Sequence, residues 1–128
     1  MPRPVRTERA PAPAGHYSQA VVHHGLVHVS GQLPIEPASG LVLADQAEGQ
    51  AEQTLRNIAE ILEAAGSGLD LVLSLTIFVL SRDDWAGVNA ACARCFGDHR
   101  PARAIIGGAA LKPGCRVEMT AVAAVRET

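Results

Sequence analysis

The chain has 128 residues, of which 48% are hydrophobic and 3% aromatic, and its formal net charge is −2. This composition argues against a disordered chain, and the small negative charge argues against a field that attracts nucleic acid. The longest apolar run, residues 71–80, is too short to span a bilayer, and no secretory leader is recognisable. We therefore expect a cytoplasmic protein with one domain over residues 11–128, after a flexible or extended N-terminal arm over residues 1–10.

Two short β-type runs in residues 17–35 flank His24-Gly25, which predicts a hairpin. Residues 45–66 have helical periodicity, and the apolar stripe consists of Ala47, Ala51, Leu55, Ile58, Leu62 and Ala65. Asp45 followed by Glu48 is typical of a capping box, and Gly66 suits the position after the last helical turn.

Residues 71–80 predict a strand that is apolar on both faces, and residues 83–97 predict a second helix. The inward stripe of that helix is expected to contain Trp85, Val88 and Cys92. Residues 103–110 and 116–125 predict two more strands. The order of the elements predicts an α+β fold with both helices on one sheet face.

Two helices can cover only one face of such a sheet. The other face is expected to carry Phe78, Leu80, Val122 and Ala124. Because a monomer would expose these side chains as an apolar patch, the pattern favours a homo-oligomer.

Arg103 and Glu118 are charged residues at or within apolar strands. If the two strands are neighbours, the two side chains could share a face. One interpretation is a salt bridge between subunits, because buried charges are usually paired. The other is a pocket in which Arg103 binds a carboxylate with two hydrogen bonds while Glu118 transfers protons.

Other polar residues give weaker signals. Cys92 and Cys95 have the C-x-x-C spacing, but no second ligand pair follows, so we expect core cysteines and no metal site. Ser30 ends a predicted strand and Asn89 lies beside the apolar stripe of the second helix. Turn formation and a solvated helix face are the simplest interpretations of these two residues.

Several stretches together resemble the Rid family of reactive-intermediate deaminases, also called the YjgF or RidA type. They are "APAGHYSQAVVHHGLVHVSGQLPIEPASG", "NIAEILEAAGSGLDLVLSLTIFV", "DDWAGVN" and "RPARAIIGGAALKPGCRVEMTAVA". The resemblance implies a chorismate-mutase-like α+β fold, with a mixed sheet, two helices on one face and a homotrimer around a central barrel. It also implies hydrolysis of 2-aminoacrylate and related 2-imino or enamine acids to 2-keto acids and ammonia, with no metal or organic cofactor.

The resemblance also assigns roles to residues. Arg103 matches the arginine that binds the substrate carboxylate, and Glu118 matches the glutamate that positions the hydrolytic water. The remaining matches are substrate-binding positions, namely Tyr17, Ser30, Gly31 and Asn89. The chain departs from the family pattern at His16, Ile105 and Thr120, which bears on substrate range and rate.

Two alternatives stay open. The first is a module of the same fold that binds or senses small carboxylates without turnover. The second is a role directed at RNA, which the net charge of −2 and the scarcity of aromatic residues argue against. The expected partners are therefore a small imino, enamino or 2-keto acid and copies of the chain itself, with no nucleic acid and no membrane.

Overall fold

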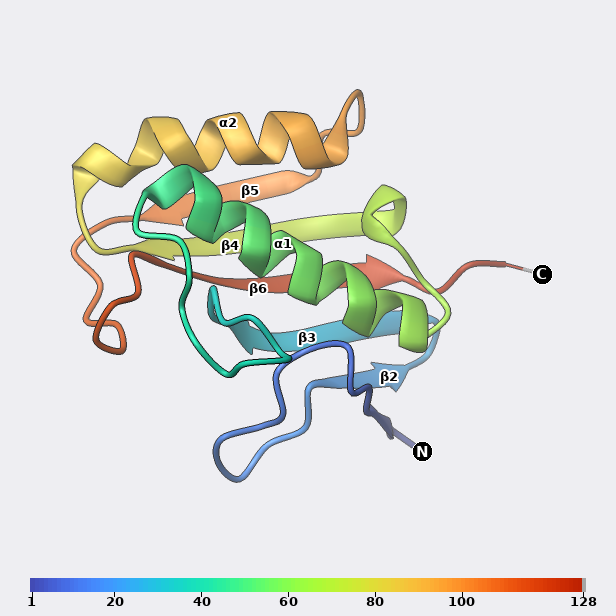
Figure 1. The fold of residues 1–128 in the computed structure, drawn as a ribbon. Coiled ribbons are helices and arrows are strands. Elements are labelled where there is room, and N and C mark those ends of the chain that lie inside the picture. Colours follow the sequence, from blue (N-terminus) through green and yellow to red (C-terminus); the bar gives the residue numbers. More distant parts are fainter. Residues whose placement is uncertain (128) are drawn as a thin grey trace.

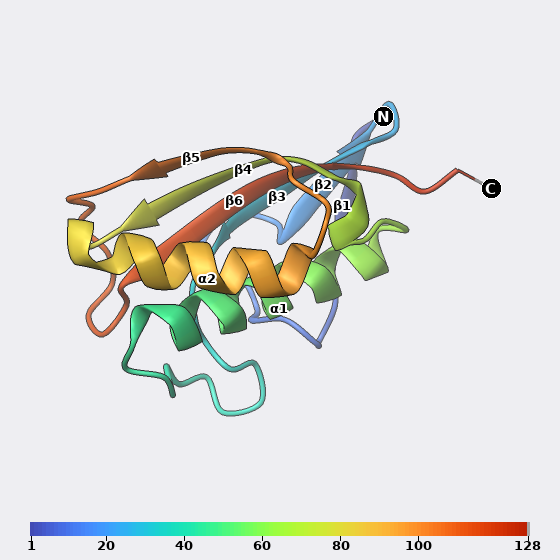
Figure 2. The ribbon, with the colours of Figure 1, turned by 90° about the horizontal axis from the view of Figure 1, so that it is seen from above.

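The computed structural model, which describes residues 1–127, contains one mixed six-stranded sheet and two helices packed against it. The strands lie in the order β1-β2-β3-β6-β4-β5, and only β4 and β5 are parallel. Both helices lie on the same side of the sheet (Figures 1 and 2). The elements are β1 (Arg3–Val5), β2 (Ala20–His23), β3 (Leu26–Gln32), α1 (Ala47–Ala64), η1 (Leu69–Leu71), β4 (Val72–Val79), η2 (Arg82–Asp84), α2 (Trp85–Phe96), β5 (Ala102–Ile106) and β6 (Val117–Ala124).

The core lies between α1 and the middle of the sheet. The predicted stripe of α1 is confirmed, because Ala51, Leu55, Ile58 and Leu62 are fully buried. These side chains pack in one cluster with the inward residues of the central strands, which include Leu75, Ile77, Val117, Met119 and Ala123. Aliphatic side chains thus supply the burial that stabilises the layers, as the composition predicts.

The predicted hairpin and the end of the first helix are confirmed. His24 and Gly25 have φ values of 48° and 77°, which are those of a tight turn between β2 and β3. Gly66 follows α1 with φ 81°. The predicted capping box is wrong: Gln46 is the N-cap and has no side-chain cap bond, and the Glu48 carboxylate is bound by Arg94 of α2.

The second helix begins later than predicted, and its first residue points to solvent instead of to the core. A capping box between Ser81 and Asp84 forms η2, so α2 starts at Trp85. Trp85 is 43% exposed, so its predicted place in the inward stripe is wrong, whereas Val88 and Cys92 are buried as predicted. The buried position at this end belongs to Asp84, whose carboxylate accepts a hydrogen bond from the Nε of Arg116.

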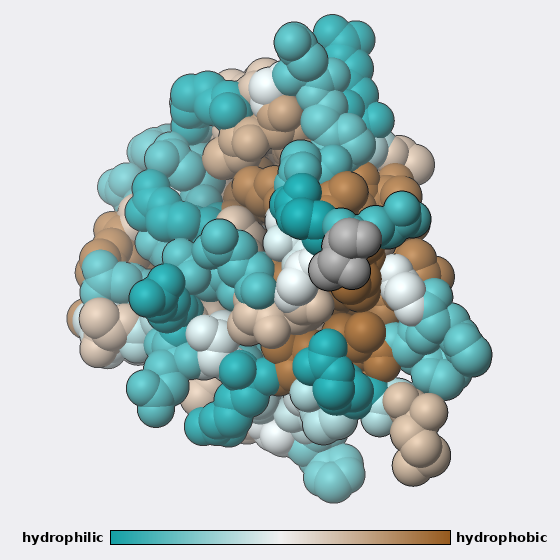
Figure 3. Space-filling model, turned by 90° about the vertical axis from the view of Figure 1, so that its right-hand side faces the viewer, coloured by the Kyte–Doolittle hydropathy of each residue, from teal (hydrophilic) through white to brown (hydrophobic). Residues whose placement is uncertain are grey.

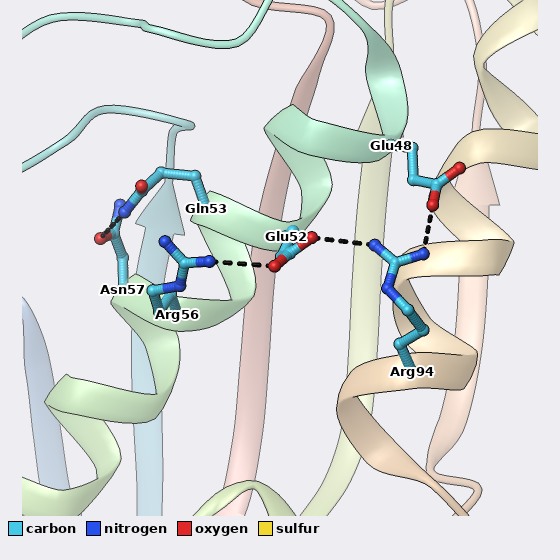
Figure 4. Close-up of polar contacts among 6 residues, drawn as sticks. All are labelled: Glu48, Glu52, Gln53, Arg56, Asn57 and Arg94. Atoms are coloured by element: carbon cyan, nitrogen blue, oxygen red, sulfur yellow. Dashed lines mark hydrogen bonds and ion pairs between the residues drawn. The ribbon is translucent and has the colours of Figure 1, made fainter.

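Ion pairs join the exposed sides of the two helices (Figure 4). Arg94 of α2 contacts both Glu48 and Glu52 of α1, and its Nη2 lies 2.9 Å from the Glu52 carboxylate. The guanidinium of Arg56 forms a second ion pair with the Glu52 carboxylate. Because these pairs are exposed and screened by solvent, they add little to stability, and the helices are held together mainly by their buried apolar sides.

Two irregularities change where strand residues point. In β4 the register shifts between Val72 and Ser74 opposite β6. The shift places Leu73 outside, 50% exposed, instead of on the buried face with Leu75. A second shift interrupts β3 between Val29 and Gln32.

The first ten residues contain the short strand β1, followed by a turn at residues 8–9. β1 pairs with β2, and the side chains of Val5 and Ala10 are buried. The amide of Gln19, itself buried, accepts from the Thr7 N–H and donates to the carbonyl oxygen of Thr7 at 3.0 Å.

The sheet face away from the helices is partly apolar. Phe78, Val122 and Ala124 are half-buried, and Leu80 is 43% exposed. Seen from the end, apolar residues gather among hydrophilic side chains on the surface (Figure 3). No helix within residues 1–127 is both long enough and apolar enough to cross a membrane.

Candidate functional site

Arg103 lies on β5, at the edge of the sheet. β5 runs parallel to β4, with Arg103 beside Leu75 and Ile105 beside Ile77. Because Leu75 and Ile77 are buried beneath the helices, Arg103 is on the helix side of the sheet. There its Nη1 donates to the Oδ1 of Asn89 on α2 at 2.9 Å. The structure thus brings together two of the predicted site residues, which we call the arginine half-site.

An open cleft of about 590 Å³ lies beside this pair, between α2 and β5. Its polar lining includes Arg100, Arg103 and Asn89, and Cys92 and Phe96 contribute an apolar wall. Burial raises the pKa of the Cys92 thiol, and the nearby Arg103 opposes that shift only in part. The thiol is therefore neutral near pH 7 and is not an activated nucleophile.

Glu118 lies on the opposite side of the sheet from Arg103. On β6, Val117 and Met119 are buried beneath the helices, so Glu118 points to the other face, beside Phe78 of β4. β4 also separates β5 from β6. The predicted possibility that Arg103 and Glu118 share a face across neighbouring strands is therefore wrong within one chain.

Gly31 creates room for the Glu118 carboxylate. The bulge in β3 places Ser30 and Gly31 between the pairs Val29–Ala121 and Gln32–Met119. A Cβ added to Gly31 would overlap the Oε2 of Glu118. Only glycine lets the carboxylate lie directly over the backbone at this point, so the local sequence positions an acid beside the bulge.

Ser30 and Tyr17 are fixed by local hydrogen bonds. The Ser30 hydroxyl donates to the carbonyl oxygen of Ser18 at 2.6 Å, so its hydrogen is already used and only its lone pairs are free to accept. The phenol oxygen of Tyr17 accepts from the Ala14 N–H at 3.2 Å, and the ring is about half exposed. We call Ser30, Gly31 and Glu118 the glutamate half-site.

Sequence reasoning missed two residues that shape these surroundings. Gln19 anchors the segment before Tyr17 through its bonds to the first ten residues. The sequence offered one signal for Gln19, because it is a polar residue at the start of an apolar run. Arg100 lines the cleft beside Arg103, and its signal was a second arginine at the start of the same stretch.

One chain therefore carries two groups of candidate site residues on opposite sides of the sheet. The arginine half-site can bind an anion, and the glutamate half-site can accept a proton or orient water. Within residues 1–127, the His, Cys, Asp and Glu side chains form no group of three or more that could hold a metal ion.

Comparison with known proteins gives a consistent result over nearly the whole chain. A family model described as Endoribonuclease L-PSP matches residues 7–125. Protein HMF1 of Saccharomyces cerevisiae is 41% identical over 124 residues, covering 97% of this chain and 95% of that protein. The 2-iminobutanoate/2-iminopropanoate deaminase of Capra hircus is 40% identical over 121 residues, covering 94% and 88%. A crystal structure of E. coli TdcF with bound serine has a TM-score of 0.91 at 31% identity and covers 97% of this chain and 99% of its own.

Proposed function

This chain belongs to the endoribonuclease L-PSP family, which includes the YjgF and RidA proteins, and on that premise we propose that it hydrolyses 2-imino and enamino acids to 2-keto acids and ammonia. The observation that carries the proposal is the Arg103 guanidinium, which faces an open cleft with one donor bound to Asn89. Arg103 forms no ion pair with a carboxylate in the part of the chain that the structure describes, so its remaining donors can bind a planar 2-imino carboxylate through two parallel hydrogen bonds.

The chemistry needs few protein groups. Protonation of the imine nitrogen makes C2 more electrophilic, and water then attacks that carbon. Glu118 accepts the proton of the attacking water, directly or through a second water molecule. Glu118 then returns this proton to the amine nitrogen of the carbinolamine. The C–N bond breaks as the C2 hydroxyl loses its proton and becomes the carbonyl, which releases ammonia and the 2-keto acid. Arg103 holds the carboxylate and so fixes C2 relative to the water.

We propose that the complete site forms between two copies of the chain. Arg103 and Glu118 lie on opposite sides of the sheet, so a second copy must bring its own Glu118 to the arginine half-site. A homotrimer with its sheets around a central barrel would also cover the partly apolar face that carries Phe78 and Val122. In this arrangement Tyr17 and Ser30 would complete the substrate pocket.

The direct test uses the purified chain and a pyridoxal-phosphate-dependent dehydratase that generates 2-aminoacrylate. Adding the chain should accelerate pyruvate release beyond the spontaneous rate, as followed by lactate dehydrogenase. The relatives are named differently, so the preferred substrate of this chain does not follow from them. The same assay should therefore be run with a panel of imines made by an amino-acid oxidase. No acceleration with any imine would exclude the deaminase.

A module that binds small carboxylates without turnover is the second candidate. A relative of the same fold is described with bound serine, and the name of HMF1 states no activity. This candidate predicts that 2-keto acids bind to the wild-type chain, that Arg103→Ala loses the binding, and that no imine is hydrolysed.

Gly31→Ala is expected to lower kcat/KM roughly 10- to 100-fold, because a displaced catalytic group costs rate even when the fold is intact. The added methyl group would push the Glu118 carboxylate from its place, and the end of that side chain can move without disturbing the sheet. Steady-state kinetics with 2-iminobutanoate would measure the effect. Gly107→Ala is the matched control, since its Cβ would meet only Val79 at 4.0 Å. Equal rates for both variants would show that the position of Glu118 does not matter.

A further inference from the structure

Arg100 is a second guanidinium in the cleft that the proposed reaction leaves without a role. It is exposed, lines the cleft together with Arg103, and precedes β5 by two residues. Within residues 1–127 it forms no ion pair and no side-chain hydrogen bond, whereas Arg94 and Arg116 each bind a carboxylate. An arginine that lines a cleft and has no acceptor is able to bind an anionic ligand there.

The charged side chains that line the cleft in one chain are both arginines. Among the described residues, its lining contains Arg100 and Arg103 but no aspartate or glutamate. The nearby acids of α1 do not compensate, because Glu48 and Glu52 are bound by Arg94 on the outer side of the helices (Figure 4). Two guanidiniums at one cleft can therefore bind two separate carboxylates of one ligand.

The remaining lining fixes how such a ligand would lie. The Nε2 of His99 is 2.7 Å from the carbonyl oxygen of Val72, so this ring nitrogen carries the hydrogen and the ring is held in place. Cys92 and Phe96 form an apolar wall, and burial keeps the Cys92 thiol neutral. A short methylene chain could pack on this wall between two polar ends.

The spacing of the two arginines suits a small diacid. Arg100 and Arg103 are three residues apart, so their backbones are separated by at most roughly 10 Å, and two long, flexible side chains can close around a ligand of four or five carbons. The cleft, at about 590 Å³, lies within the usual range of ligand pockets, about 300–1,000 Å³. A three-carbon imino acid would leave much of it, including Arg100, unused.

We propose that the preferred substrates are 2-imino acids with a second carboxylate, of the four- and five-carbon class derived from acidic amino acids. This inference rests on the proposed function and specifies its substrate. Arg103 binds the carboxylate next to the imine, and Arg100 binds the distal one. The reaction is unchanged: water adds to C2, the C–N bond breaks, and a 2-keto diacid and ammonia are released.

The test compares 2-iminoglutarate with 2-iminobutanoate, both generated by amino-acid oxidases and followed by trapping the remaining imine with semicarbazide. Arg100→Gln should lower kcat/KM for 2-iminoglutarate roughly tenfold or more, the loss expected for a hydrogen bond to a charged group. For 2-iminobutanoate it should change the value less than twofold. Arg100→Lys should keep part of the preference as a point charge, and Arg82→Gln, an exposed charge change in η2, should leave both values unchanged.

Binding of the product acids separates failure of this inference from failure of the proposed function. Calorimetry should show 2-oxoglutarate binding more tightly than 2-oxobutanoate, with the difference lost in Arg100→Gln. This result without any imine turnover would support the second carboxylate site and overturn the hydrolytic proposal. Turnover of 2-iminobutanoate with no selective effect of Arg100→Gln would overturn the inference and leave the deaminase standing. Equal competition by inorganic phosphate would show general anion attraction and would also overturn the inference.

Discussion

Arg103→Ala is expected to reduce kcat/KM for every imino acid by at least roughly 100-fold, since each hydrogen bond to a charged group is worth about 1.5–3 kcal/mol and two are lost. The variant also loses the group that fixes C2 relative to the attacking water. Arg103 is exposed and donates to Asn89, which is exposed as well, so the fold should be retained. The coupled 2-aminoacrylate assay, with circular dichroism to confirm folding, would measure the loss.

Two further variants separate charge from geometry in this prediction. Arg103→Lys keeps the charge but not the pair of parallel donors, so it should recover only part of the rate. Asn89→Ala removes the acceptor that orients the guanidinium and should weaken activity less than Arg103→Ala does. Full activity of Arg103→Ala would mean that the substrate carboxylate binds elsewhere.

Local sequence patterns predicted the parts of the fold that depend on local physics. The stripe of α1 is one of these, because Leu55, Ile58 and Leu62 repeat on one helical face and are all buried. The turn at His24-Gly25 is another, because both residues readily adopt positive φ. Such features can be predicted because they depend only on residues that are close together in the sequence.

Features that depend on distant contacts were mispredicted or missed. β4 lies between β5 and β6, so the assumed neighbourhood of Arg103 and Glu118 was wrong. The bulge that turns Leu73 outward arises from pairing with β6. Trp85 is exposed because Asp84 occupies the buried position at that helix end and binds Arg116. None of these pairings leaves a periodic signal in the sequence.

Part of the candidate site could likewise be predicted from the sequence, and part of it could not. The sequence identified Arg103 because a guanidinium beside an apolar run needs an anionic partner, and it identified Glu118 by strand alternation. It could not reveal that the two side chains lie on opposite sides of one sheet, since that depends on the strand order. That separation is the structural reason to propose a site shared between copies.

Mixing two inactive variants tests this shared site most directly. Arg103→Ala lacks the arginine half-site, and Glu118→Gln lacks the carboxylate of the glutamate half-site, so each alone should be inactive in the 2-aminoacrylate assay. After co-expression with two different affinity tags, a sequential purification isolates assemblies that contain both variants. In a cyclic trimer that contains both variants, one of the three interfaces, roughly a third of the sites, combines an intact Arg103 from one copy with an intact Glu118 from the next.

The co-expressed and doubly purified protein should recover roughly this fraction of wild-type activity, as expected for a symmetric oligomer with sites between copies. The same two variants purified separately and assayed without exchange should stay inactive. If assemblies shown to contain both tags are no more active than either variant alone, the site does not combine Arg103 and Glu118 from different copies, and the proposed shared site is wrong.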